Sequence, residues 1–127
     1  MSNATAADTA RLVDRYIEAW NETDPAARRT VIARTYTEDA TYLDPLLSGV
    51  GHAAIDTMIG AAQPQFGGAR FRLTGDVDAH HDVVRYAWAL GPEDAPLLSG
   101  VDFGVIADGR FRSITGFFDF MPATGGE

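Results

Sequence analysis

Apolar residues in the first part of the chain recur at helical spacing. Between residues 12 and 20 they form one stripe, made of Leu12, Val13, Tyr16, Ile17 and Trp20. This stripe predicts a helix with one buried face, which begins at Asp8 or Thr9 and ends by Asp24. Because Asp24 is followed by Pro25, a cap and a proline suited to a first helical turn, we expect a second helix that reaches about Tyr36.

A short strand and a third helix are expected next. Alternating side chains predict a strand over residues 40–44, which Pro45 stops. We expect a loop over residues 46–51. Apolar residues three and four apart then predict a helix from His52 to about Ala62, and Pro64 ends it.

The second half of the chain alternates apolar and polar residues with the period of a strand. The alternation predicts a long strand over residues 70–79, a turn at 80–82 and a returning strand over Val83–Leu90. After a loop over 91–96, residues 97–107 and 110–120 are expected to form a hairpin across Asp108-Gly109, a dipeptide typical of two-residue turns. Helices followed by an antiparallel meander predict an α+β fold with helices on one sheet face.

Composition narrows the classes of function. The 127 residues, 46% hydrophobic and 22% charged, predict one domain over 1–127 with loose ends at about 1–8 and 121–127. A net charge of -8, with no cluster among the arginines, disfavours nucleic acid and anionic membranes as partners. The absence of lysine and cysteine excludes Schiff-base and thiolate chemistry. Since no membrane span or signal peptide is evident, we expect a soluble cytoplasmic protein.

The last hairpin carries an acid in an unusual setting. Asp102 lies between Gly100 and Gly104 on one face of its strand. A two-residue turn places Asp102 beside Thr115 and Gly100 opposite Phe117, unless a bulge shifts the register. The glycines then leave a hollow with a carboxyl group in its floor. The alternative is that this face is open to solvent and Asp102 is hydrated.

The opposite face of the hairpin is expected to be apolar. A sheet covered by helices on one side leaves its other side to water or to a partner. We therefore expect a homodimer formed through that face, with these contributing residues: Val101, Phe103, Val105, Ile114 and Phe118.

Two other polar residues are candidates for chemistry. Asp44, before Pro45, is either a catalytic acid or the start of a turn. Tyr16 is either a core residue or a site tyrosine, and its hydroxyl needs a partner in both cases. His80 and His81 fall in a predicted turn, where solvated side chains are expected. Without a metal-ligand motif or a glycine-rich phosphate loop, we expect no metal and no cofactor.

The order of elements and three polar positions resemble the NTF2-like (SnoaL-like) superfamily, and within it the ketosteroid isomerases. R-Y-I-E-A-W-N-E-T-D-P resembles the family's first helix, with Tyr16 at the oxyanion-binding tyrosine. E-D-A-T-Y-L-D-P resembles the strand ending in the proton-shuttling base, here Asp44. L-S-G-V-D-F-G-V-I-A-D-G-R-F resembles the strand with the acid that partners the tyrosine, here Asp102. The resemblance implies a cone of about three N-terminal helices on a curved, mostly antiparallel sheet, and dimers.

This resemblance implies proton transfer next to a carbonyl of a small, apolar, steroid- or polyketide-like ligand. Asp44 would move the proton, while Tyr16 and a protonated Asp102 would donate hydrogen bonds to the enolate oxygen. Burial on an apolar floor predicts a raised pKa for Asp102. The remaining contacts to the substrate are expected from Trp20, Trp88, Phe117 and Asp119.

Three alternatives stay open, because this fold supports many activities. A polyketide-cyclase-like enzyme would use the same base to start an aldol closure. An epoxide-hydrolase-like site would use Arg85 and Asp119, although Ala87 stands where its central acid is expected. The third alternative is a non-catalytic cone that binds an apolar ligand.

Overall fold

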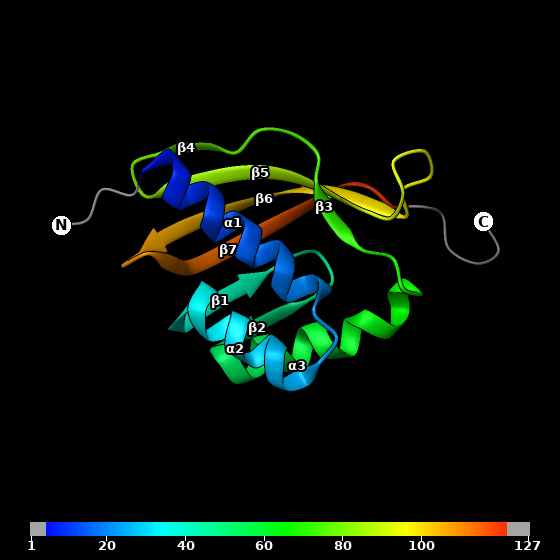
Figure 1. Ribbon diagram of the computed structural model, residues 1–127, viewed down its shortest axis with the longest axis horizontal. Coiled ribbons are helices and arrows are strands. Elements are labelled where there is room, and N and C mark those ends of the chain that lie inside the picture. The colour runs from blue at the N-terminus through cyan, green and yellow to red at the C-terminus, as the bar shows by residue number, and fades with distance from the viewer. Residues whose placement is uncertain (1–4, 122–127) are drawn as a thin grey trace.

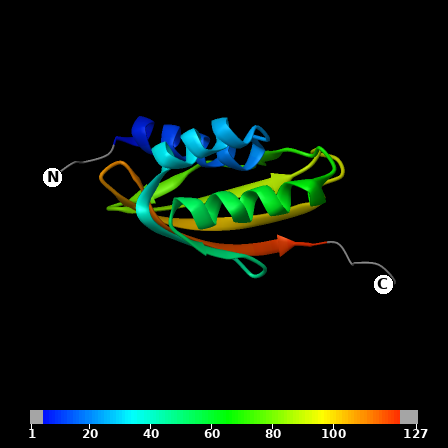
Figure 2. The ribbon, with the colours of Figure 1, turned by 90° about the horizontal axis from the view of Figure 1, so that it is seen from below.

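Three helices cover one face of a curved sheet, as Figures 1 and 2 show for this computed structural model. The structure describes residues 5–121. The helical elements are α1 (Ala6–Asn21), α2 (Pro25–Thr35), α3 (His52–Ala62) and the short 3-10 helix η1 (Gln63–Phe66). The strands are β1 (Tyr36–Leu43), β2 (Ser48–Val50), β3 (Phe71–Leu73), β4 (Asp78–His80), β5 (Val83–Leu90), β6 (Leu98–Ala107) and β7 (Arg110–Phe120). The predicted α+β cone is confirmed.

The sheet joins the two halves of the chain. Its strand order is β2-β1-β7-β6-β5-β3, and β4 also pairs with β5. β1 and β7 run parallel, whereas the other pairs are antiparallel. Leu43, the last residue of β1, pairs with Thr115 in the middle of β7. The turn that follows β1 therefore begins beside the last hairpin. No helix among residues 5–121 is long and apolar enough to cross a membrane.

The first helix starts earlier than the sequence pattern suggested. Thr5 is its cap: the Thr5 hydroxyl accepts a hydrogen bond from the Asp8 amide, and the Asp8 carboxylate accepts one from the Thr5 amide. Residues 6–8, expected to be loose, therefore form its first turn. The expected loose C-terminal residues 122–127 lie outside the described residues. The predicted cap of α2 at Asp24 and the predicted bounds of α3 are confirmed.

Three predictions about the strands were wrong. The loop expected over residues 46–51 contains β2, because the turn at Asp44 reverses the chain onto β1. The long strand expected over 70–79 is divided into β3 and β4, which pair with opposite ends of β5. Its break includes Gly75, a residue that weakens strand pairing. β1 also starts at Tyr36, four residues before the expected start.

A bulge in the last hairpin changes which side chains face the helices. Asp108 and Gly109 form the predicted turn, with φ of 52° and 80°. Beyond it the register shifts at the bulge, so that Asp102 pairs with Gly116 and not with Thr115. A shift of one residue exchanges the two faces of a strand.

Because of this exchange, the prediction that Ile114 and Phe118 lie on the outer face of the sheet was wrong. Ile114 is buried at 1% exposure, and Phe118 faces the interior. The outward aromatic residue on β7 is Phe117, whose ring packs against Phe103 with centroids 5.9 Å apart. Both rings are largely exposed, at 53% and 42%. The homodimer expected through this face stays a prediction.

A buried polar cluster connects the three helices. The Arg28 Nε on α2 donates to Asp56 on α3 over 2.7 Å, and its Nη1 donates to Gln63 over 2.9 Å. Gln63 in turn donates to the carbonyls of Trp20 and Glu22 at the end of α1. The cluster therefore holds the ends of all three helices together.

We expect Arg28→Ala to lower the free energy of unfolding by about 2 kcal/mol, because it leaves Asp56, whose side chain is only 16% exposed, without its cation. Urea unfolding measures this change. The matched control is Arg85→Ala, which removes a pair with Asp78 whose side chains are 58% and 63% exposed. That control should cost less than about 1 kcal/mol, and equal losses for the two variants would contradict the assignment.

A candidate active site between helices and sheet

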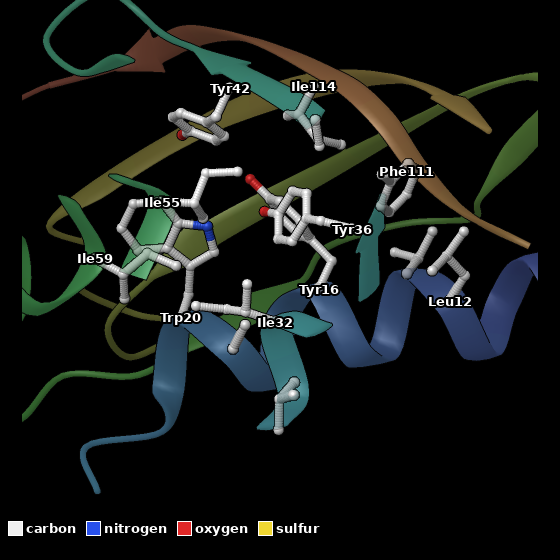
Figure 3. Packing of buried hydrophobic residues seen from close by; sticks show 14 of the residues in the cluster. Leu12, Tyr16, Trp20, Ile32, Tyr36, Tyr42, Ile55, Ile59, Phe111 and Ile114 are labelled. Atoms are coloured by element: carbon white, nitrogen blue, oxygen red, sulfur yellow. The ribbon is translucent and has the colours of Figure 1, made fainter. Parts of the chain in front are cut away.

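An apolar cavity of about 460 Å³ lies between the helices and the sheet. Its walls include large aromatic side chains from α1, η1, β3, β5 and β7: Trp20, Phe66, Phe71, Trp88 and Phe118. Among its lining residues only four carry polar groups other than indoles: Tyr16, Tyr42, Asp44 and Gln65. Figure 3 shows Tyr16 and Trp20 rising from α1 toward Tyr42 of β1. Such a cavity suits a small apolar molecule with one polar end.

Tyr16 connects the cavity to the buried Asp102. Its hydroxyl donates a hydrogen bond to Asp102 Oδ2. The other carboxyl oxygen of Asp102 accepts a bond of 2.9 Å from the Trp88 indole N–H. Asp102 is 1% exposed and is not among the residues that line the cavity. It therefore lies behind Tyr16, with both oxygens bonded, and the solvent-exposed alternative for this face was wrong.

The expected hollow at Gly100 and Gly104 is filled by aromatic rings. A Cβ at Gly100 would lie 2.7 Å from the Trp88 ring, and one at Gly104 would lie 2.4 Å from the Phe111 ring. The glycine that shapes the site is Gly116, where a Cβ would lie 2.6 Å from Asp102 Oδ1 and 3.3 Å from Asp44 Cβ. Gly116 thus lets the two acids approach each other from the two sides of β7.

Burial raises the pKa of Asp102 to about 6, as predicted from the sequence. Hydrogen bonds from Tyr16 and Trp88 oppose this rise, and the nearby Asp44 charge adds to it. Burial, together with Asp102, also raises the pKa of Tyr16 well above 10. Tyr16 therefore keeps its proton. An ionised Asp102 accepts the hydrogen bond from the Tyr16 hydroxyl.

Asp44 both starts a turn and faces the cavity. Its Oδ1 accepts hydrogen bonds from the Leu46 and Leu47 amides, each over 2.8 Å. Its Oδ2 accepts one from the Tyr42 hydroxyl over 2.6 Å. The two sequence interpretations of Asp44 are therefore compatible, because the turn holds a carboxylate that lines the cavity.

Tyr42 was missing from the expected site. The strand alternation already placed it on the same side as Asp44, two residues away, and this was the signal that could have identified it. Burial, followed by the charges of Asp102 and Asp44, raises its pKa well above 10. Tyr42 therefore keeps its proton and donates it to the hydrogen bond with Asp44.

The structure brings only part of the expected substrate contacts together. Trp20 and Trp88 line the cavity. Phe117 and Asp119 do not, because the bulge turns Phe118 inward and leaves both of its neighbours exposed. Arg85 lies outside as well, in its exposed pair with Asp78. An epoxide-hydrolase-like set built on Arg85 and Asp119 is therefore contradicted.

Comparisons with known proteins agree with this fold and place the chain in a family. The SnoaL-like domain family matches residues 13–114, and the chain therefore belongs to the SnoaL-like family. Proteins of isomerase and polyketide-cyclase type share this fold. Among curated proteins, the sequence has no significant match.

Three solved structures illustrate the likeness. A protein of Agrobacterium tumefaciens str. C58, provisionally assigned as an isomerase of the SnoaL-like family, is 34% identical with a TM-score of 0.83, over 90% of this chain and 99% of that one. A provisional ketosteroid isomerase of Kribbella flavida DSM 17836 is 22% identical, with a TM-score of 0.66 over 95% and 86%. A provisional SnoaL-like polyketide cyclase of Jannaschia sp. CCS1 is 19% identical, with a TM-score of 0.74 over 94% and 90%.

We expect Asp102→Asn to stabilise the protein at neutral and higher pH. A folded pKa of about 6, against an ordinary value of 3.8, means that folding favours the neutral acid. Asp102 therefore costs almost nothing below about pH 3, where it is neutral in both states, and its cost grows as the pH rises from about 3 until it passes about 6. The variant should gain on the order of 3 kcal/mol at about pH 8, and almost nothing at about pH 3. Urea unfolding at the two pH values checks this, and a gain that is independent of pH would contradict it.

Proposed function

We propose that this protein catalyses proton transfer at a carbon next to the carbonyl of a neutral, apolar molecule, in the manner of a ketosteroid isomerase. The observation that carries the proposal is the placement of Tyr16 and Asp44 on one apolar cavity, with the buried Asp102 behind Tyr16. A carboxylate base and a hydroxyl donor are the two groups that such a reaction requires.

The proton is taken by Asp44 Oδ2, because Oδ1 already accepts two amide hydrogen bonds. The electron pair of the broken C–H bond forms the carbon–carbon double bond of an enolate, and the carbonyl oxygen gains the negative charge. Tyr16 donates a hydrogen bond to this oxygen. Asp44 then returns the proton to carbon, at the original position or at a conjugated one, and is ionised again.

Asp102 acts through Tyr16 in this scheme. The resemblance to ketosteroid isomerases implied that Tyr16 and Asp102 both donate to the substrate oxygen, but of these two residues only Tyr16 lines the cavity. A neutral Asp102 donates to the Tyr16 oxygen and leaves the Tyr16 proton free for the substrate. An ionised Asp102 holds that proton instead, so Tyr16 donates into the cavity only when Asp102 is protonated.

The substrate is neutral on this proposal. Among residues 5–121, Asp44 is the only charged residue that lines the cavity, and no arginine or histidine of this range does. An anionic substrate would meet an uncompensated carboxylate in an apolar site. A polyketide-cyclase-like reaction begins with the same proton removal, so one assay of that step tests the base in both cases.

We expect the protein to exchange the hydrogens next to the carbonyl of β-tetralone, a flat apolar ketone, in deuterated water. NMR follows the loss of the C–H signal. Asp44→Asn should lower the rate by at least about 100-fold, because the base is lost. Asp119→Asn, on the exposed part of β7, should keep the rate of the parent. A parent rate equal to that of buffer would refute the proposal.

We expect β-tetralone to bind less tightly as the pH rises through about 6, the pKa of Asp102. A ketone accepts hydrogen bonds but donates none, so it needs the Tyr16 proton that an ionised Asp102 holds. Tyr16→Phe should weaken binding at low pH by about 1–3 kcal/mol and remove the pH dependence. The Asp102→Asn variant should bind β-tetralone with the same affinity at every pH in this range. Calorimetry measures the affinities, and pH-independent binding by the parent would contradict the link.

A further inference from the structure

We propose that Tyr42 is a positioning residue for the base: its hydroxyl holds Asp44 Oδ2 so that the remaining lone pair faces the cavity. The catalytic consequence rests on the proposed function, whereas the effect on the Asp44 carboxylate does not. Tyr42 is part of neither the expected site nor the cluster of Tyr16 and Asp102.

The hydrogen bonds of Asp44 identify the oxygen that reacts. A carboxylate oxygen has two lone-pair sites, and the Leu46 and Leu47 amides occupy those of Oδ1. Oδ2 accepts only the bond from Tyr42, over 2.6 Å, so one of its sites stays free. A proton from a ligand in the cavity therefore arrives at Oδ2, beside the Tyr42 hydroxyl.

Tyr42 is fixed well enough to aim this bond. It is 5% exposed, and its ring packs against Trp20 with centroids 5.7 Å apart. On β1 it pairs with Ile114 of β7, two residues before Asp44. A buried ring held by an aromatic neighbour and a strand pair has little freedom to turn its hydroxyl away from the acid.

Among the described residues, no other side chain donates a hydrogen bond to Asp44. The titratable groups that face it are Tyr42 on the same strand, Tyr16 on α1 and Asp102 on β6. β7 contributes Gly116, and η1 contributes the uncharged Gln65. Within the described part of the chain no cationic residue lines the cavity, and the groups that stabilise the charge of Asp44 there are three hydrogen-bond donors.

The bond from Tyr42 favours the ionised form of Asp44. A hydrogen bond to a carboxylate is about twice as strong as one between neutral groups, so its strength falls when Asp44 takes up a proton. Tyr42 thereby keeps the base ready in the resting protein and promotes the return of the proton to carbon. Its loss should leave Asp44 ionised only at higher pH and less well aimed.

The test compares Tyr42→Phe with Tyr36→Phe. The Tyr36 hydroxyl is also fully buried in this core but has no hydrogen-bond partner among the described residues, so its removal is a matched control. The exchange of the hydrogens next to the carbonyl of β-tetralone is measured in deuterated water across the acid pH range. Independently of catalysis, the amide NMR signals of Leu46 and Leu47 report when Asp44 loses its proton.

We expect Tyr42→Phe to lower the exchange rate at about pH 7 about tenfold, with ketone affinity changed less than twofold. The acid side of its rate profile and the midpoints of the two amide signals should move up by about one pH unit. Tyr36→Phe should change none of these. In the parent, the Cζ signal of Tyr42 should follow the same midpoint as the amides, and this measurement needs no folded variant.

Each outcome bears on one proposal. Unmoved amide midpoints in Tyr42→Phe, or a Tyr42 Cζ signal that ignores the amide midpoint, overturn the inference. A loss of ketone affinity equal to the loss of rate also overturns it, because Tyr42 would then be only part of the wall. Shifted midpoints in a protein that exchanges no ketone support the positioning of Asp44 and refute the proposed function.

Discussion

The hydrogen bond between Tyr16 and Asp102 is the contact around which this site is organised. It joins α1 to β6 across 86 positions of sequence, within a core where both residues are almost inaccessible. A carboxyl group at that depth loses its hydration and must be compensated by donors or by a proton. The fold supplies the Tyr16 hydroxyl and the Trp88 indole, and burial still raises the pKa of Asp102 to about 6. An acid whose pKa is raised to about 6 is thereby joined to a hydroxyl donor that faces the cavity from α1.

The parallel pairing of β1 with β7 brings the second acid to the same place. Asp44 follows β1 directly, and Gly116 on β7 separates it from Asp102 without a side chain between them. The two acids meet different surroundings. Backbone amides and Tyr42 stabilise the charge of Asp44, whereas aromatic residues enclose Asp102. The same fold thus places one carboxyl group where donors meet both of its oxygens at the cavity wall, and the other where burial raises its pKa.

In the proposed reaction, tyrosine hydroxyls are the donors that stabilise negative charge. Tyr16 and Tyr42 each bond to one of the two acids, and both line the cavity. Buried phenols with pKa values well above 10 remain donors throughout the ordinary pH range. In a site of low polarity, such fixed donors stabilise negative charge more than they would in water.

The sequence by itself determined most of the elements. Periodic apolar residues, the Asp24-Pro25 cap and the Asp108-Gly109 turn predicted the three helices, β5 and the last hairpin, because these features act over a few neighbouring residues. Strand alternation placed Asp102 on the same face as Gly100 and Gly104, and helical spacing made Tyr16 part of an apolar stripe. The resemblance to ketosteroid isomerases then implied roles for Tyr16, Asp44 and Asp102.

The tertiary structure decided how these groups meet. A bulge in β7 is set by packing on both sides of a strand, so alternation could not show that Phe118, and not Phe117, lines the cavity. The hollow expected at Gly100 is filled by Trp88 of β5, a residue 12 positions earlier in the chain. Whether Asp102 touches a ligand or stands behind Tyr16 depends on that packing as well. Local sequence sets the direction of a side chain relative to its own element, and only contacts between distant elements set what the side chain meets.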